Sequence, residues 1–469
     1  MNLIADKYVR GVSAVVLFLA ACATVGAEDP SPPRPNFVFF YADDLGYGDL
    51  ACYGSQVAKT PNLDRLAAEG TRFTQFYVSH CVCSPTRCSA LTGHWPSRHR
   101  IYAHLAYLKS NRQRHMPNYL DVKAPSLPRG LQRSGYRTAM IGKWHLGGGS
   151  GQEFRGSAIN DPNAPAVVEY GFDLARTTFG NSQTWKDAEP WPEPHDVYPY
   201  EDPGWQRWSS RAVAEETIRF LEDHVKEHRG EPFYVNVWFK DVHTPFRPTA
   251  EMLEPFGALP EPSRTHYAMV HFMDAQIGRV LNTLDELGLR DQTVVVFSSD
   301  NGAAKGRGGS NGSLRAWKWW IYEGGIRVPL IVRWPGHVPD GRTDEESVLS
   351  IVDFVPTFCR LAGASMPEGY QPDGLDVIDA LEGRSFRRGQ PLFWHHPTAG
   401  RRCPKLAVRD GAWKLLMDPD GSRLELYDLA ADPAEQRDVA DRHPEIVERL
   451  KTMLLGWYPT LPRPYGTGP

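Results

Sequence analysis

The sequence has no long apolar run beyond its N-terminal segment, no internal repeat and no excess of charge of one sign. No later stretch reaches the roughly 18 apolar residues that a transmembrane helix needs, so we expect none. The 52 basic and 56 acidic side chains give a net charge of −4. The protein therefore lacks the excess of basic residues that is typical of nucleic-acid-binding proteins. With 41% apolar and 23% charged residues, the 469-residue chain has the composition of a folded protein.

Cysteine is also scarce, with seven residues in the whole chain. Six would remain after removal of an N-terminal signal, but Cys81, Cys83 and Cys88 fall within eight residues, a spacing that argues against three disulfides. No C-x-x-C pair is present, and no zinc-type spacing with a nearby histidine. We expect one of these three to have a chemical role, and Cys52, Cys359 and Cys403 to behave as small buried apolar residues.

The first 27 residues have the pattern of a secretory signal. Two basic residues precede an apolar run over residues 12–21, too short to span a bilayer comfortably. The signal could be cleaved after Ala27. The alternative is a bacterial lipobox ending at Cys22, which would leave a lipid anchor on that cysteine. Either way we expect export to the periplasm or the extracellular space, with the Pro-rich residues 28–35 as a tether.

Short apolar strands alternate with helical stretches along most of the chain. This order predicts an α/β fold with a mainly parallel sheet and helices on both faces, in a catalytic domain over residues 36–390. After Pro391 short strands and one helix predict a small antiparallel α+β subdomain over residues 391–469. The expected strands are 36–41, 71–78, 136–142, 232–239, 293–299, 405–409, 413–416 and 424–427, and the expected helices are 61–70, 211–225, 266–287 and 444–455.

Periodicity fails between about 151 and 210, where aromatic residues interleave with Pro, Gly and Asp. This pattern predicts a long irregular insertion near the site. The aromatic residues are Phe179, Trp185, Trp191, Tyr198, Tyr200, Trp205 and Trp208.

Polar clusters follow the expected strands: Asp43-Asp44, Lys143-Trp144-His145, Asp241-Val242-His243 and Asp300-Asn301. In parallel sheets ligands bind beyond the carboxyl ends of the strands. We therefore expect these clusters to form one site.

Ordered motifs make the chain resemble the type I sulfatase family. The signature C-x-P-x-R is present as Cys83-Ser84-Pro85-Thr86-Arg87, followed by Thr92-Gly93. The motifs at 41–46, 142–147, 299–302 and 322–329 agree with the family in order, and residues 308–314 before Lys318 look most like the branch of arylsulfatase A and N-acetylgalactosamine-6-sulfatase. The resemblance spans about residues 35–440 and implies an alkaline-phosphatase-like fold.

The resemblance implies that a separate maturation enzyme converts Cys83 to formylglycine. One hydroxyl of the hydrated aldehyde would attack sulfur, and deprotonating the other would expel sulfate. Arg87 would hold the aldehyde hydrate, and Lys143 and Lys318 would neutralise the sulfate. The resemblance further implies that His145 is the base that deprotonates the second hydroxyl. It implies that His243 either binds the sulfate or acts as the acid that protonates the leaving group.

A metal ion is implied as well. Asp43, Asp44, Asp300 and Asn301, with the modified residue 83 as a further ligand, offer hard oxygen atoms that suit Ca²⁺ better than Mg²⁺. Asp43-Asp44 alone could be solvated turn carboxylates, but the second pair favours the metal.

The substrate is less well specified by the sequence. Arg98, His99 and Arg100 depart from the commoner family pattern in a loop expected to border the substrate, and Trp185 and Trp191 could stack on sugar rings. We therefore expect a sulfated carbohydrate rather than a simple aryl sulfate. Two alternatives stay open: a phosphodiesterase or phosphonate monoester hydrolase of the same superfold, and a non-enzymatic, calcium-dependent, exported sugar-binding protein.

Overall fold

The computed structural model describes residues 34–147, 161, 163–178, 203–245 and 248–465, with side chains of the fifth helix from residue 209 onward. The predicted signal, Cys22, Trp185 and Trp191 lie outside these residues. Among the helices described, none is both long and apolar enough to cross a bilayer.

A nine-stranded sheet forms the centre of the larger part of the fold, in the order β4-β3-β5-β1-β6-β7-β2-β8, with β9 beside β2. Only β7 runs antiparallel to its neighbours β6 and β2, which confirms the predicted mainly parallel sheet. The strands are β1 (Asn36–Ala42), β2 (Thr71–Tyr77), β3 (Arg137–Lys143), β4 (Leu174–Thr178), β5 (Phe233–Trp238), β6 (Thr293–Ser299), β7 (Arg327–Arg333), β8 (Arg342–Asp344) and β9 (Leu349–Ser350).

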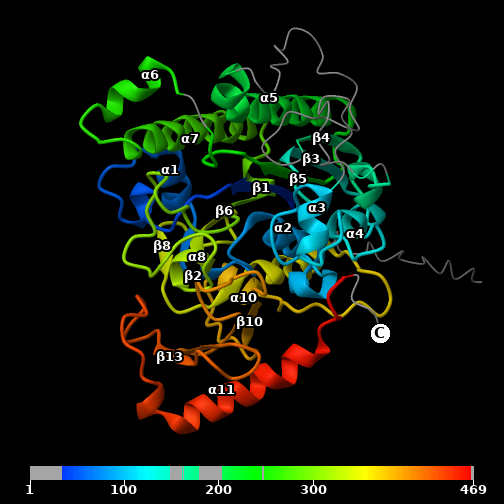
Figure 1. Cartoon of the computed structure of the whole chain (residues 1–469). Helices are drawn as coiled ribbons and strands as arrows, with labels where there is room; N and C mark the ends of the chain where they lie inside the picture. The colour runs from blue at the N-terminus through cyan, green and yellow to red at the C-terminus, as the bar shows by residue number, and fades with distance from the viewer. Residues whose placement is uncertain (1–33, 148–160, 162, 179–202, 246–247, 466–469) are drawn as a thin grey trace, which may run out of the picture. The chain divides into compact units, whose positions relative to one another are not determined.

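Both faces of this sheet are buried, and alternate residues of a strand therefore pack into two different apolar clusters, one on each face. In β1, Phe37 and Phe39 belong to one apolar cluster, whereas Val38 and Phe40 belong to the other. Helices α1, α5 and α7 cover one face, and α2 and α4 lie on the other (Figure 1). The helices are α1 (Pro61–Ala68), α2 (Cys83–Thr92), α3 (Leu108–Gln113), α4 (Leu127–Arg133), α5 (Pro203–Glu227), α6 (Ala250–Leu253), α7 (Ser263–Glu286), α8 (Glu323–Ile326), α9 (Phe354–Ala362), α10 (Ile378–Leu381) and α11 (Pro444–Trp457).

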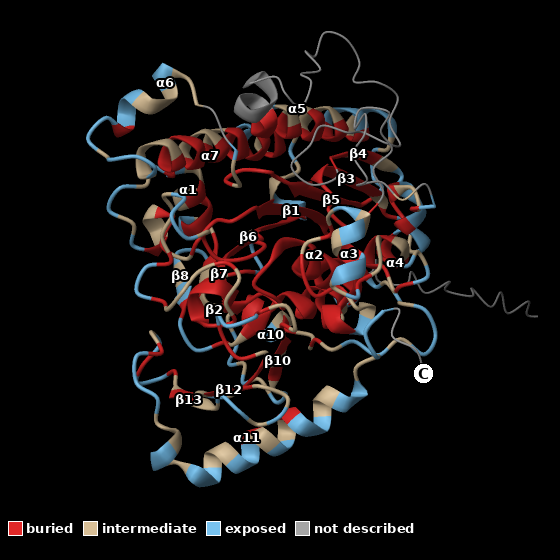
Figure 2. Cartoon of the chain, in the orientation of Figure 1, coloured by how far each residue is buried: buried red, intermediate tan, exposed pale blue. Residues whose placement is uncertain are grey.

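A second, antiparallel sheet follows, as predicted, and β10 adds a fourth strand to the three that were expected. Its strands, in spatial order, are β10 (Leu392–His395), β11 (Leu406–Asp410), β12 (Trp413–Met417) and β13 (Glu425–Asp428). Helix α11 packs on it through Leu450 and Leu454, which join a third apolar cluster. The outer face of α11 is exposed (Figure 2), so this helix has one buried side.

The expectation of an irregular segment over residues 151–210 is wrong where the structure describes it. Strand β4 extends the main sheet there by pairing with β3, and α5 begins at Pro203 rather than at residue 211. Strand β4 was not predicted because it is a short edge strand, and its sequence Leu-Ala-Arg-Thr-Thr has too few apolar residues to show a strand pattern.

Candidate active site

The carboxyl ends of β1, β3 and β6 bring the predicted acidic and basic groups to one edge of the sheet. Strands β1 and β6 pair in register at Ala42 and Ser299, so the next residues, Asp43 and Asp300, lie side by side. Both side chains are completely buried. Asp44 follows with a φ of 63°, a turn that redirects the chain after the strand.

Cys83 begins helix α2 directly after the extended residue Val82. One ligand atom from each of Cys83, Asp43 and Asp300 lies within 4.8 Å of the others. Burial raises the pKa of the Cys83 thiol, against the opposing effect of Lys143 and Lys318. An unmodified Cys83 would therefore be a protonated thiol, which is a poor nucleophile.

Arg87 lies one turn further along α2 and is also completely buried. Its Nε and Nη2 donate to Asp300 Oδ2 at 3.0 and 2.8 Å, and its Nη1 donates to the Lys143 carbonyl oxygen at 2.8 Å. The guanidinium carbon also lies 5.5 Å from the centre of the Tyr41 ring and 5.2 Å from that of Trp238, an arrangement of cation–π type. This arginine thus fixes two strand ends relative to Cys83.

Each of the two predicted sulfate-binding lysines contacts one of the adjacent aspartates. Lys143 Nζ donates to Asp43 Oδ2, and Lys318 Nζ donates to Asp44 Oδ1 at 2.5 Å. Burial alone would raise the pKa of Asp43, but the neighbouring charges of Lys143, His243, Arg87 and Lys318 together outweigh it and hold that pKa far below its usual value. The site therefore concentrates positive charge around a carboxylate that stays ionised.

The donor atoms fit a divalent cation bound by oxygen. Asp43 Oδ1 and Asn301 Oδ1 are buried and have no hydrogen-bond partner among the residues described. Asn301 Nδ2 donates to Asp44 Oδ1 at 2.8 Å, which joins the second predicted pair to the first. Burial and then the Asp43 charge raise the pKa of Asp300 to about 7. A cation bound among these carboxylates would offset the repulsion between their negative charges.

The two predicted catalytic histidines lie at the same edge, and burial lowers the pKa of both. His145 Nε2 is 3.0 Å from the Leu105 carbonyl oxygen, so Nε2 carries the proton and Nδ1 the lone pair. Burial holds the pKa of His145 well below its usual value, which keeps this imidazole neutral. His243 Nε2 lies 3.6 Å from Asp44 Oδ2, and burial lowers the pKa of His243 to about 4.

The predicted substrate rim makes contacts with other protein groups. Arg98 pairs with Asp373 at 2.6 Å, the His99 ring stacks on His94, and Arg100 Nε donates to the Arg463 carbonyl oxygen at 2.6 Å. Their contact with substrate stays a prediction, as does that of Trp185 and Trp191.

Sequence reasoning missed His104. Its ring centre lies 6.3 Å from that of His145 and 5.3 Å from that of Trp319. Burial lowers the pKa of His104 to about 3, with smaller effects from charges that include Lys318 and Lys143. A single histidine in an irregular segment carries no periodic or motif signal, so only the three-dimensional structure places it here.

Known proteins resemble this chain over most of its length. Residues 35–364 match the family described as Sulfatase, and residues 316–457 match the region described as N-sulphoglucosamine sulphohydrolase, C-terminal. The chain is 27% identical to N-acetylgalactosamine-6-O-sulfatase of Bacteroides thetaiotaomicron, covering 90% of this chain and 92% of that protein, and 31% identical to arylsulfatase A of Homo sapiens, covering 94% and 90%. The crystal structure of Ps i-CgsB in complex with k-i-k-neocarrahexaose has a TM-score of 0.75 at 25% identity, covering 92% of this chain and 94% of that one.

Proposed function

Because the chain belongs to the sulfatase family, we propose that it hydrolyses sulfate esters of a carbohydrate through a formylglycine made from Cys83. The single observation that carries this proposal is the position of Cys83, buried at the start of α2 within 4.8 Å of Asp43 and Asp300 and influenced by the charges of Lys143 and Lys318. Similarity to an N-acetylgalactosamine-6-O-sulfatase and to a protein bound to a neocarrahexaose supports a sugar substrate.

The proposed chemistry begins when one hydroxyl of the hydrated residue 83 attacks sulfur and the alcohol of the sugar leaves. Loss of the proton from the second hydroxyl then re-forms the aldehyde and breaks the bond to sulfate. His145 is suited to accept this proton, because its neutral ring carries the lone pair on Nδ1. Arg87 holds the strand ends around residue 83, and the two lysines supply fixed positive charge for the sulfate oxygens.

Asp43, Asp44, Asp300 and Asn301, with residue 83, would hold the cation, for which we propose Ca²⁺. A divalent cation supplies charge stabilisation for the transferring sulfate group. His243 would bind the sulfate or protonate the leaving group; both roles require a proton on Nε2. Burial opposes that proton, and a bound sulfate anion would favour it.

The two other functions considered above make different predictions for residue 83. A phosphodiesterase or phosphonate monoester hydrolase would cleave phosphate esters or phosphonates at least as fast as sulfate esters. A sugar-binding protein would keep an unmodified cysteine and would turn over neither substrate. Paired rates on both ester types distinguish the first alternative, and peptide mass distinguishes the second.

The decisive experiment compares Cys83→Ala with Cys88→Ala, which removes a second buried thiol of the same helix. We expect Cys83→Ala to lose all measurable sulfatase activity, because it removes the nucleophile, while its melting temperature stays near that of the wild type. Cys88→Ala should keep most of the activity. Mass analysis of the wild-type peptide that contains residue 83 should show the aldehyde. Sulfatase activity retained in Cys83→Ala would refute the mechanism.

A further inference from the structure

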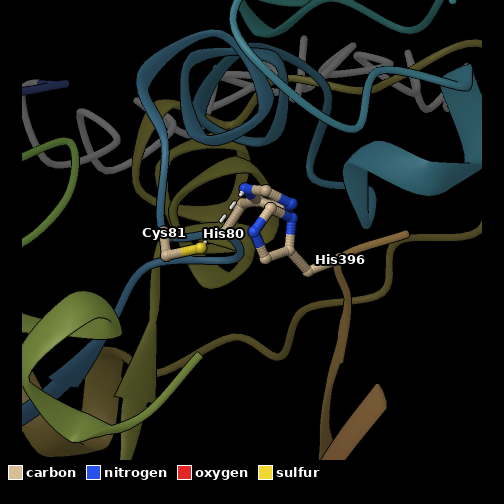
Figure 3. A group of neighbouring side chains, drawn as sticks. All are labelled: His80, Cys81 and His396. Atoms are coloured by element: carbon tan, nitrogen blue, oxygen red, sulfur yellow. Dashed lines mark hydrogen bonds between the residues drawn. The ribbon is translucent and has the colours of Figure 1, made fainter. Parts of the chain in front are cut away.

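A second group of metal-ligating side chains lies outside the active site. His80 and Cys81 belong to the segment between β2 and α2, and His396 directly follows β10. One nitrogen or sulfur atom of each lies within 4.8 Å of the others. Cys81 Sγ is 3.9 Å from His80 Nδ1, and the two imidazole rings meet edge to face with centres 4.8 Å apart (Figure 3).

The environment of this group suits a soft metal ion. All three side chains have no exposed surface, and burial holds the pKa of His80 and of His396 below the usual value. Both rings are therefore neutral, the form that binds metals. His80 Nε2 is buried with no hydrogen-bond partner in the part of the chain that the structure describes.

We propose that His80, Cys81 and His396 bind a zinc ion. One thiolate and two imidazoles form a ligand set that favours Zn²⁺ over Ca²⁺ or Mg²⁺. Tetrahedral zinc with bond lengths of roughly 2.0–2.3 Å needs ligand atoms about 3.5 Å apart, so the observed separations require only small side-chain movements. On binding, the thiol would lose its proton to solvent, since a coordinated thiol is deprotonated.

Neighbouring groups support this assignment. His396 Nε2 lies 3.3 Å from the Trp319 carbonyl oxygen, the kind of partner that orients a metal-binding imidazole through its other nitrogen. That nitrogen, Nδ1, lies 3.3 Å from Thr398 Oγ1, a contact that the zinc ion would replace. The sequence does not indicate this group, because His396 lies more than 300 positions after Cys81, and zinc-finger ligands are much closer together in sequence.

The proposed zinc would join three segments that position the active site. Cys81 precedes Cys83 by two residues, and its carbonyl oxygen accepts a hydrogen bond of 3.0 Å from the Trp319 amide, next to Lys318. His396 comes from the start of the C-terminal sheet. The ion would thus hold the entry to α2 and the Lys318 segment against β10, which is a structural role.

The test uses the full chain in a Cys83→Ala background, so that residue 83 contributes no sulfur. Zinc content is measured by mass spectrometry after dialysis with calcium present, and Co²⁺ replaces zinc to reveal thiolate coordination by its near-ultraviolet charge-transfer band. We expect about one zinc per chain and a clear band. His396→Ala and Cys81→Ser should lose the band and at least roughly 100-fold in zinc affinity, whereas Cys88→Ser should retain both.

Two results would overturn the proposal. The first is a parent protein without stoichiometric zinc and without the cobalt band, which would leave a metal-free contact between a thiol and an imidazole; this measurement needs no folded variant. The second is a band that persists in Cys81→Ser. Because zinc is measured rather than turnover, neither result depends on whether the chain acts on sulfated sugars.

Discussion

Arg87 connects more groups of the active site than any feature of its sequence motif suggests. Its guanidinium donates twice to Asp300 and once to the Lys143 carbonyl oxygen, with no exposed surface. A planar fork with several fixed donors can satisfy this geometry, whereas a lysine ammonium can replace only part of it. The arginine of the signature therefore has a positioning role besides its charge.

We predict that Arg87→Lys lowers kcat/KM at least roughly 100-fold and destabilises the fold by about 1–3 kcal/mol, since a buried carboxylate loses a hydrogen bond. Arg388→Lys is the matched control, because Arg388 forms a similar forked pair with the buried Asp353 at 2.8 Å. Both variants should unfold at lower urea concentration, and only Arg87→Lys should lose activity in the folded state. Equal losses of activity would assign Arg87 a purely structural role.

The sequence predicted which residues gather at the active site better than it predicted how they contact one another. Motif order and strand ends placed Asp43 and Asp300 together, because parallel strands end at one edge. The partners of those carboxylates were not predictable: Lys318 meets Asp44 across 274 positions, and the Trp238 ring flanks Arg87 from another strand. Such contacts depend on tertiary packing, which local patterns do not encode.

Strands and helices with strong periodicity were predicted well, and the exceptions have physical causes. Helix α2 is buried along its whole length, so its sequence shows no amphipathic pattern. Strand β7 contains Pro329, which argues against a central strand. The structure accommodates it because β2 shifts register between Phe73 and Phe76, opposite this proline. A bulge in one strand thus admits a proline in its neighbour.

A buried ionic group links the C-terminal sheet to the catalytic domain. Lys414 of β12 donates to Glu323 of α8 and pairs with Glu435, each at 2.9 Å, and all three side chains are buried. Burial raises the pKa of Glu435 to about 7, although Lys414 acts in the opposite direction. The Lys414 ammonium thus compensates both buried carboxylates, and Arg327 Nη1, 3.6 Å from Glu323 Oε2, is a second cation beside one of them.

We predict that Lys414→Met destabilises the protein by about 3–5 kcal/mol, because it leaves the buried Glu435 carboxyl without its cation. The loss should be larger at pH 8 than at pH 6, since the carboxylates can take up protons only at lower pH. Arg384→Met, which breaks pairs at a side chain 54% exposed, should cost little. Urea unfolding at the two pH values measures both; a loss independent of pH would argue against uncompensated charge.

Buried and half-buried histidines give the whole protein a dependence on acid that its small net charge does not indicate. Burial, with smaller effects of His94 and Arg98, lowers the pKa of His99 to about 3, and burial lowers that of His395 to about 3. In the unfolded chain each would titrate near 6.5. Between those values the unfolded state binds more protons than the folded state, so the stabilisation is complete above about pH 6.5 and is lost as the pH falls.

We predict that the free energy of unfolding falls between pH 7.5 and 5.5, and that His99 alone contributes about 1.4 kcal/mol of this loss at pH 5.5, one pH unit below its unfolded pKa. His99→Gln removes the titrating group, so its stability should depend less on pH by about that amount, whatever its absolute stability. His443→Gln, at a ring 38% exposed, is the control and should keep the wild-type dependence. Urea unfolding at several pH values measures these slopes. An unchanged slope in His99→Gln would mean that the His99 ring is hydrated or charged in the folded protein, and the acid sensitivity would then have to come from other buried groups.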